Sequence, residues 1–95
     1  MAGYVILDIE VLDPSGYEEY KKLAPPSVAA FGGKYLVRGG SYETVEGEWH
    51  PQRLVVLEFE SPAVAKTWLE SPEYRPARQM REKYAHTKAV IVEGA

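Results

Sequence analysis

The sequence predicts one α+β domain, in which strands and helices follow one another in the order β, α, β, β, α, β. Two observations lead to this order. Runs with apolar residues at every second position indicate strands, and two pairings of a capping residue with proline indicate helix starts. The chain has 95 residues, the length of one compact domain, so we assign residues 1–95 to a single core.

The first strand is expected over residues 4–11, where the odd-numbered residues are apolar and the even-numbered ones include Asp8 and Glu10. Asp13 then supplies an N-cap, and the proline after it suits the first helical position. Pro25 and Pro26 should interrupt the hydrogen bonding of this helix, because proline has no N–H to donate. A further turn should follow and end at a glycine pair, residues 32–33.

A second strand is expected over residues 34–38. Gly39 and Gly40 follow it inside an apolar and β-branched run that continues to Val45, and this predicts a bulge or a sharp bend. Residues 46–48, Glu-Gly-Glu, should form the turn into a third strand over residues 53–60.

A second helix should begin at Ser61, restart at Ser71, and continue over residues 73–85 before a last strand over residues 88–93. The two halves of the chain are weakly alike, since residues 6–10 align with residues 56–60 and each segment is followed by a capping residue and proline. Such a duplication is typical of the ferredoxin-like pattern, with an antiparallel sheet in the order 4-1-3-2 and both helices on one face.

The other face of that sheet would have no helix to cover it. It carries apolar side chains from both central strands, namely Tyr4, Ile6, Leu54 and Val56. A second copy of the chain could bury them, so we expect a homodimer formed sheet to sheet.

With these elements in place, the sequence resembles the family known as domain of unknown function 1330, within the dimeric α/β-barrel superfamily. The motifs that carry the resemblance are Asp13-Pro14 with Tyr17 and Tyr20, Gly32-Gly33, Arg38-Gly39-Gly40, Glu46-Gly47, Glu58-Phe59 and Ser71-Pro72-Glu73-Tyr74. The resemblance implies a dimeric barrel but no particular activity, because the family is uncharacterised. Its superfamily relatives include cofactor-free monooxygenases, small isomerases, haem enzymes and binding proteins.

Composition disfavours several classes of function. There is no cysteine, and the net charge of -3 lacks the basic excess that nucleic acid binding needs. No targeting or membrane-spanning pattern is present, which favours a soluble cytoplasmic protein. The glycines form no nucleotide-binding motif and no helical pair of histidines or carboxylates has metal-ligand spacing, so we expect neither cofactor nor metal.

Two acidic residues are candidates for acid–base catalysis. Asp8 and Glu58 occupy equivalent positions on the two central strands, on the face that the helices do not cover. Two carboxylates close together in a dimer cavity could raise one pKa and serve as a general acid or base. Alternatively, either residue could pair with Arg38 or with a cross-strand lysine or arginine.

Arg38, Gly39 and Gly40 are candidates for substrate binding. Missing side chains at the glycines could let an anionic ligand approach the backbone while the guanidinium binds its carboxylate with two hydrogen bonds. The alternative interpretation is a bulge with an arginine that only neutralises a neighbouring carboxylate.

The remaining candidates are aromatic. Trp49 and Tyr74 have the mixed polarity of residues at a pocket rim, although packing would also account for Tyr74. His50 and His86 lie near predicted element boundaries, which favours exposed or hydrogen-bonded loop residues over catalytic ones.

Three hypotheses of function remain open. The first is a metal-free enzyme in which Arg38 anchors a small anionic or carbonyl substrate while Glu58 or Asp8 moves a proton. The second is a module that binds a small hydrophobic metabolite, and the third is a structural dimer whose pocket is filled by side chains.

Overall fold

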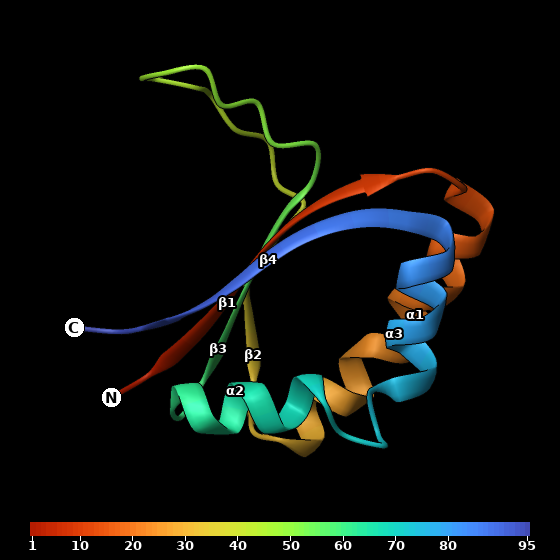
Figure 1. Cartoon of the computed structure of the whole chain (residues 1–95), viewed down its shortest axis with the longest axis vertical. Helices are drawn as coiled ribbons and strands as arrows, with labels where there is room; N and C mark the ends of the chain where they lie inside the picture. Colours follow the sequence, from red (N-terminus) through yellow and green to blue (C-terminus); the bar gives the residue numbers. More distant parts are fainter.

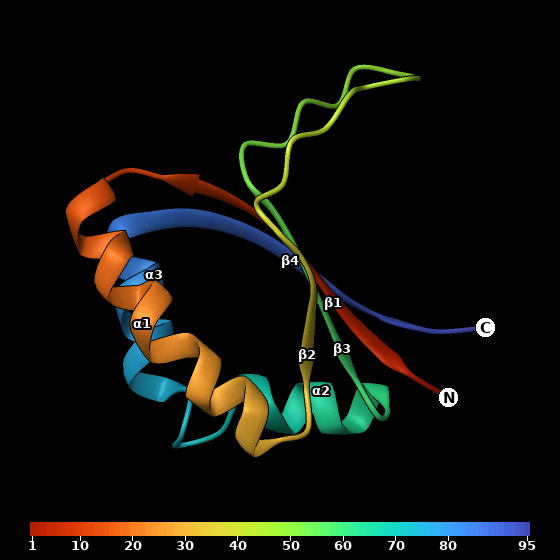
Figure 2. The same ribbon diagram turned by 180° about the vertical axis from the view of Figure 1, so that it is seen from behind.

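The computed structural model describes residues 1–95 and confirms the ferredoxin-like arrangement. Its elements are β1 (Gly3–Val11), α1 (Pro14–Ala30), β2 (Lys34–Arg38), β3 (Leu54–Phe59), α2 (Pro62–Leu69), α3 (Arg75–Tyr84) and β4 (Ala85–Glu93). The strands form one antiparallel sheet in the order β2-β3-β1-β4, which is the predicted order read from its other edge. Figures 1 and 2 show all three helices on the same side of the sheet.

The core lies between the sheet and the helices. Val5, Leu7 and Ile9 of β1 are almost fully buried on this side, as the alternation in the sequence predicted. Residues 55, 57 and 59 of β3 line the same face, and Trp68 of α2 packs over them with its ring 5.2 Å from that of Phe59. We call this side of the sheet the inner face and the uncovered side the outer face.

Helix α1 differs from the prediction, because it continues through Pro25 and Pro26 without a break. Asp13 caps its first turn by accepting hydrogen bonds from two backbone N–H groups, at 3.1 and 3.2 Å. Pro25 deprives the carbonyl of Lys21 of its usual donor, but the Arg38 guanidinium of β2 donates to that oxygen at 2.9 Å. A side chain from another element therefore supplies a bond that the helix lacks.

Two further boundaries differ from those predicted by more than one residue. Helix α3 begins at Arg75, two residues later than expected, and β4 begins at Ala85, three residues before Lys88. The pairing of β4 with β1 explains its length, since it runs without interruption from Gly3 opposite Glu93 to Val11 opposite Ala85. Pairing along the whole of β1, rather than the local pattern of residues, determines where β4 begins.

The chain between β2 and β3 forms an irregular projection over residues 40–52, which we call the arm. Figures 1 and 2 show it extending beyond the body, away from the helices. No backbone hydrogen bond joins its two limbs, and Val45 near its tip is 83% exposed. The expected turn at residues 46–48 is present, with Gly47 at a φ of 74°.

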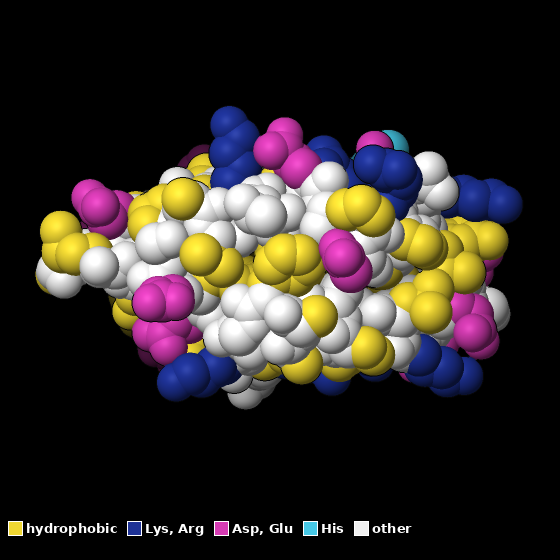
Figure 3. Space-filling model, turned by 90° about the horizontal axis from the view of Figure 1, so that it is seen from below, with side chains coloured by type: hydrophobic (Ala, Val, Ile, Leu, Met, Phe, Trp, Pro, Cys, Tyr) yellow, Lys and Arg dark blue, Asp and Glu magenta, His cyan; other side chains and the backbone are white.

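No helix is both long and apolar enough to cross a bilayer. In the view of Figure 3, hydrophobic side chains are interspersed with polar ones, and most lysine and arginine side chains lie toward the edges. This side of the molecule therefore carries no continuous field of one charge.

Candidate functional site

Strand pairing arranges the side chains of the outer face in rows. His86 lies opposite Glu10, and the next row contains Lys88, Asp8 and Leu54. The row after that is entirely apolar and contains Val90, Ile6, Val56 and Val37. The last row contains Val92, Tyr4, Glu58 and Lys34. The outer face thus has a polar end near the arm, an apolar row across its middle and a mixed row at the far end.

Asp8 and Glu58 share this face but lie far apart along it. Four residue positions separate their rows, or about 14 Å at the usual rise of a strand. Glu58 accepts a hydrogen bond from the Tyr4 hydroxyl at 3.1 Å and pairs with Lys34 at 3.6 Å. The hydrogen bond to Glu58 raises the pKa of Tyr4. Within one chain the two carboxylates are therefore not neighbours, and Glu58 has the cross-strand partner of the alternative interpretation.

Asp8 lies where the arm meets the sheet. Its carboxylate accepts a hydrogen bond from the backbone N–H of Gln52 at 2.8 Å, which joins the base of the arm to β1. Beside it is an open cavity of about 520 Å³, lined by Asp8, Glu10, Trp49, His50, Gln52, His86, Thr87 and Lys88. Asp8 thus contributes both to the attachment of the arm and to the wall of this cavity.

A second, more apolar cavity of about 310 Å³ adjoins the first. Its lining is Ile6, Asp8, Trp49, Leu54, Lys88, Ala89 and Val90. Asp8, Trp49 and Lys88 line both cavities, so the two are parts of one depression, which we call the outer groove. The groove is polar at the end near the histidines and apolar toward the middle of the sheet.

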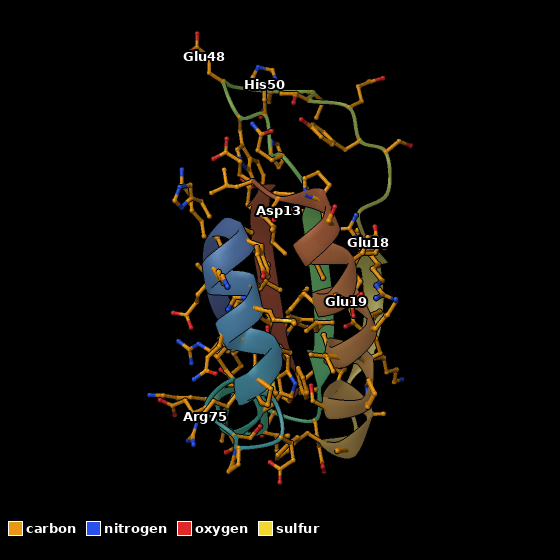
Figure 4. All side chains as sticks on the ribbon, turned by 90° about the vertical axis from the view of Figure 1, so that its right-hand side faces the viewer. Asp13, Glu18, Glu19, Glu48, His50 and Arg75 are labelled. Atoms are coloured by element: carbon orange, nitrogen blue, oxygen red, sulfur yellow. The ribbon has the colours of Figure 1, made fainter.

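Both histidines line the polar end of this groove, although they are 36 positions apart in the sequence. His86 projects from β4 rather than from a loop, and His50 belongs to the arm, where its Nδ1 lies 3.4 Å from the Thr44 hydroxyl. Figure 4 shows His50 and Glu48 on the arm, beyond the ends of the helices. No three histidine or acidic side chains come together in a way that could hold a metal ion.

Arg38 lies on the inner side of the sheet, so within one chain it neither pairs with Asp8 or Glu58 nor anchors a substrate beside them. A β-bulge between Tyr35 and Val37 inserts one extra residue into β2, which places Arg38 opposite the inward-facing Val55. One extra residue moves every later side chain to the opposite face. The Arg38 guanidinium consequently lies 4.7 Å from the centre of the Tyr35 ring, on the side of α1.

The two glycines after Arg38 differ from each other. Gly39 has a φ of 71°, and a side chain there would overlap the guanidinium of Arg53. Gly40 faces open space. Gly39 therefore makes room for a protein side chain, and only Gly40 has the open surroundings that ligand approach would need.

Arginine and tyrosine side chains form a buried cluster behind the inner face. The hydroxyls of Tyr20 and Tyr74 lie 2.8 Å apart, and Nε of Arg81 donates to Tyr74 at 3.2 Å. Tyr74 is fully buried, which corresponds to the packing interpretation and not to a pocket rim. Burial raises the pKa of Tyr20 and, against the opposing effect of Arg53, that of Tyr17. Burial alone would lower the pKa of Arg81, but Tyr74, together with Tyr20 and Glu82, offsets this and the net direction is upward.

Arg53 is the residue immediately before β3, and its side chain lies in the same region. Its guanidinium lies 5.5 Å from the centre of the Tyr17 ring, and its buried Nε has no hydrogen-bond partner. Neither Arg53, Arg38 nor Arg81 has a carboxylate within 4.0 Å. Arg53 was not a predicted site residue, although its position on the same face as Val55, Leu57 and Phe59 placed a charge among core residues.

Comparison with solved structures shows the same fold. A protein of unknown function from Rhodopseudomonas palustris is 18% identical with a TM-score of 0.76, over 99% of this chain and 82% of that one. A protein from a Jannaschia species, described as dimeric, ferredoxin-like and of unknown function, is 12% identical with a TM-score of 0.67, over 99% of this chain and 100% of that one. A protein from Thermobifida fusca with the same description is 11% identical with a TM-score of 0.60, over 99% and 92% of the two chains.

No curated protein matches the sequence. A family model does match it, over residues 2–95. This match includes every strand and helix, both faces of the sheet and the arm. The chain belongs to the family described as domain of unknown function 1330.

Proposed function

We propose that the protein is a homodimer that packs through its outer face and binds a small organic compound in the outer groove. The apolar middle row supports the dimer, because Val90 is 57% exposed and its row crosses the whole sheet with no helix to cover it. An exposed apolar patch of this kind is typical of an interface. The proteins from Jannaschia and Thermobifida fusca, which share the fold, are described as dimeric.

The observation that carries the binding proposal is the continuity of the two cavities. Asp8, Trp49 and Lys88 form the junction between a polar end and an apolar end. Ligand pockets usually combine an apolar lining with a few polar groups that fix orientation. The compound that suits this groove has an apolar body, lying on Leu54 and Val90, and an anionic or carbonyl head near Lys88.

A second copy would convert the groove into an enclosed cavity. When two outer faces pack together, the apolar ends of the grooves are covered and water is excluded from the polar ends. Exclusion of water strengthens the interaction of Lys88 with an anionic head group. Dimerisation should therefore raise the affinity for the ligand, and the ligand should stabilise the dimer.

A thermal-shift and calorimetry panel of short aliphatic carboxylates and their neutral amides would test the binding site. We expect carboxylates with several methylene groups to raise the unfolding temperature of the wild type and to bind more tightly than the amides. Lys88→Met should abolish the preference for the carboxylate. Lys34→Met is the matched control, because Lys34 lies on the same face beside Glu58 at the far end. Equal responses of the two variants, or no ligand that stabilises the wild type, would contradict the proposed site.

Acid–base catalysis in the same groove is a second candidate function. It is favoured by the presence of Asp8, His50 and His86 in the lining of the polar end, since histidine is the side chain that most readily exchanges protons near neutral pH. The step would be removal of a proton from the carbon next to a carbonyl, followed by return of a proton to the resulting enolate.

Deuterium exchange would separate catalysis from binding. NMR of a bound enolisable ketone or keto acid in D2O should show loss of the proton next to the carbonyl faster than in buffer. His86→Gln should slow this exchange while leaving binding in place. If the wild type exchanges the proton no faster than buffer while still binding the compound, the groove is a binding site only.

A further inference from the structure

We infer that the inner face carries a second binding site, for a small singly charged anion, between Arg53, Arg38 and the surrounding tyrosines. This inference is independent of the outer groove, because it rests on different residues on the opposite side of the sheet. It starts from an imbalance of charge. Cationic groups gather behind the sheet, yet Arg53 and Arg38 have no carboxylate partner.

The geometry defines where the anion would lie. A small void of about 10 Å³ is lined by Tyr17, Tyr20, Tyr35, Lys21, Arg38 and Arg53, together with apolar residues of the sheet. A void of this size holds about one water-sized particle. A halide ion or one oxygen of a carboxylate is therefore the appropriate size class, and a phosphate is too large for the void as it stands.

The polar side chains around the void are three cations and three phenols. The Nε of Arg53 is buried without an acceptor, and a buried N–H group with no partner is unfavourable. The phenol of Tyr17 interacts with the Arg53 guanidinium, but burial still raises the pKa of Tyr17 and that of Tyr35, so both hydroxyls remain protonated near neutral pH. A phenol hydroxyl can donate as well as accept, so the tyrosines can turn their hydrogens toward an anion that the guanidinium groups attract. The positive charge of Arg53 and Arg38, which no carboxylate balances, therefore favours an anion.

The void can be reached from solvent. Arg38 is the last residue of β2, at the exposed edge of the sheet, and its guanidinium forms one side of the opening next to Lys21. Lys21 pairs with Glu18 at 3.3 Å on the surface of α1, so its own charge is already partly balanced. Arg53 is the deeper and less compensated cation. We assign it the main contact with the anion and Arg38 the position at the entrance.

Bromide is a suitable probe, because it is halide-sized and is identified in crystals by its anomalous scattering. Wild-type crystals grown in sodium bromide should show an anomalous peak within hydrogen-bonding distance of the Arg53 guanidinium. In solution, the wild type should broaden the ³⁵Cl NMR signal in a way that bromide reverses by competition. Absence of a bromide peak at the inner face would overturn the inference.

Substitutions make the test specific. Arg53→Gln should weaken bromide binding at least about tenfold, since it removes a charge-assisted hydrogen bond. Arg75→Gln is the control, because Arg75 is exposed at the start of α3 and remote from the void. If Arg53→Gln does not fold, Arg38→Gln at the sheet edge replaces it, with a smaller expected loss. Chloride broadening that is equal in the wild type and in the arginine variants would show that the ion binds elsewhere and would contradict the site.

Discussion

The two faces of the sheet are built from the same strands, but their charged side chains have different surroundings. On the outer face, charged groups lie beside partners of opposite sign or in an open groove, as Lys34 and Glu58 illustrate. On the inner face, Arg81 is only 6% exposed and its hydrogen-bond partner is a phenol. The difference follows from the helices, which remove water from one side only. Apolar packing on the inner face stabilises the fold, and the outer face remains available for recognition.

The largest contrast between the faces should appear in stability. Phe59→Ala removes a buried ring that packs against Trp68, and we expect it to lower the free energy of unfolding by about 3–5 kcal/mol. Glu58→Gln, one residue earlier and on the outer face, should lower it by less than about 1 kcal/mol. Urea denaturation at equal protein concentration measures both. Equal losses would show that the two faces of β3 are not packed differently.

The next contrast concerns self-association. Val90→Asp places a charge in the apolar row of the outer face, where two copies would bring like charges together. We expect the dissociation constant of the dimer to rise at least about a hundredfold, measured by sedimentation. Leu23→Asp is the control, because Leu23 is similarly exposed, at 44%, but lies on α1. Dissociation by Leu23→Asp alone would instead indicate a dimer formed through the helices.

The glycine pair gives a finer test of how the inner cluster shapes the backbone. Gly39→Ala introduces a side chain at positive φ and against Arg53, and we expect it to cost about 1–2 kcal/mol or more. Gly40→Ala faces open space and should change stability by about 0.5 kcal/mol or less. Thermal and urea unfolding of the two variants measure the difference. If Gly40→Ala proved the more damaging, the placement of Arg53 against the chain would be wrong.

The smallest expected effect is a dependence on pH that arises from the inner face. Burial raises the pKa of Tyr17, Tyr20 and Tyr35 above the ordinary value of 10.0. Their contribution to stability is therefore complete below pH 10 and is lost as the pH rises through the pKa values of the folded state. The reason is that these phenols lose their protons at a lower pH in the unfolded chain than in the folded one. The free energy of unfolding should be lower near about pH 11 than near about pH 8.

Single substitutions would assign this alkaline loss to the inner face. Tyr35→Phe should make the decrease less steep, because it removes one buried phenol. Tyr42→Phe, on the exposed arm, should leave the decrease as in the wild type. Urea titrations at the two pH values compare the slopes. A decrease that responds to Tyr42→Phe and not to Tyr35→Phe would place the titrating groups on the arm.

Local patterns in the sequence were sufficient for the elements and their order. Alternation of apolar residues defined the two faces of β1 and β3, and Asp13 and Ser61 marked helix starts that the structure confirms as N-caps. These signals work because they depend on residues a few positions apart, and the sheet order follows from the way such elements pack. The apolar outer face could likewise be read from the alternation.

Only the tertiary structure decided which charged residues lie together. The bulge in β2 placed Arg38 on the inner face, and the arm placed His50 in the same cavity lining as His86, 36 positions away in the sequence. Arg38 also donates a hydrogen bond to the carbonyl of Lys21 in α1. This helix is unbroken, although Pro25 and Pro26 predicted a break. Each of these outcomes depends on strand register or on contacts between segments that are far apart in the sequence. Such contacts produce no periodic pattern of residues within a short segment, so the sequence alone does not reveal them.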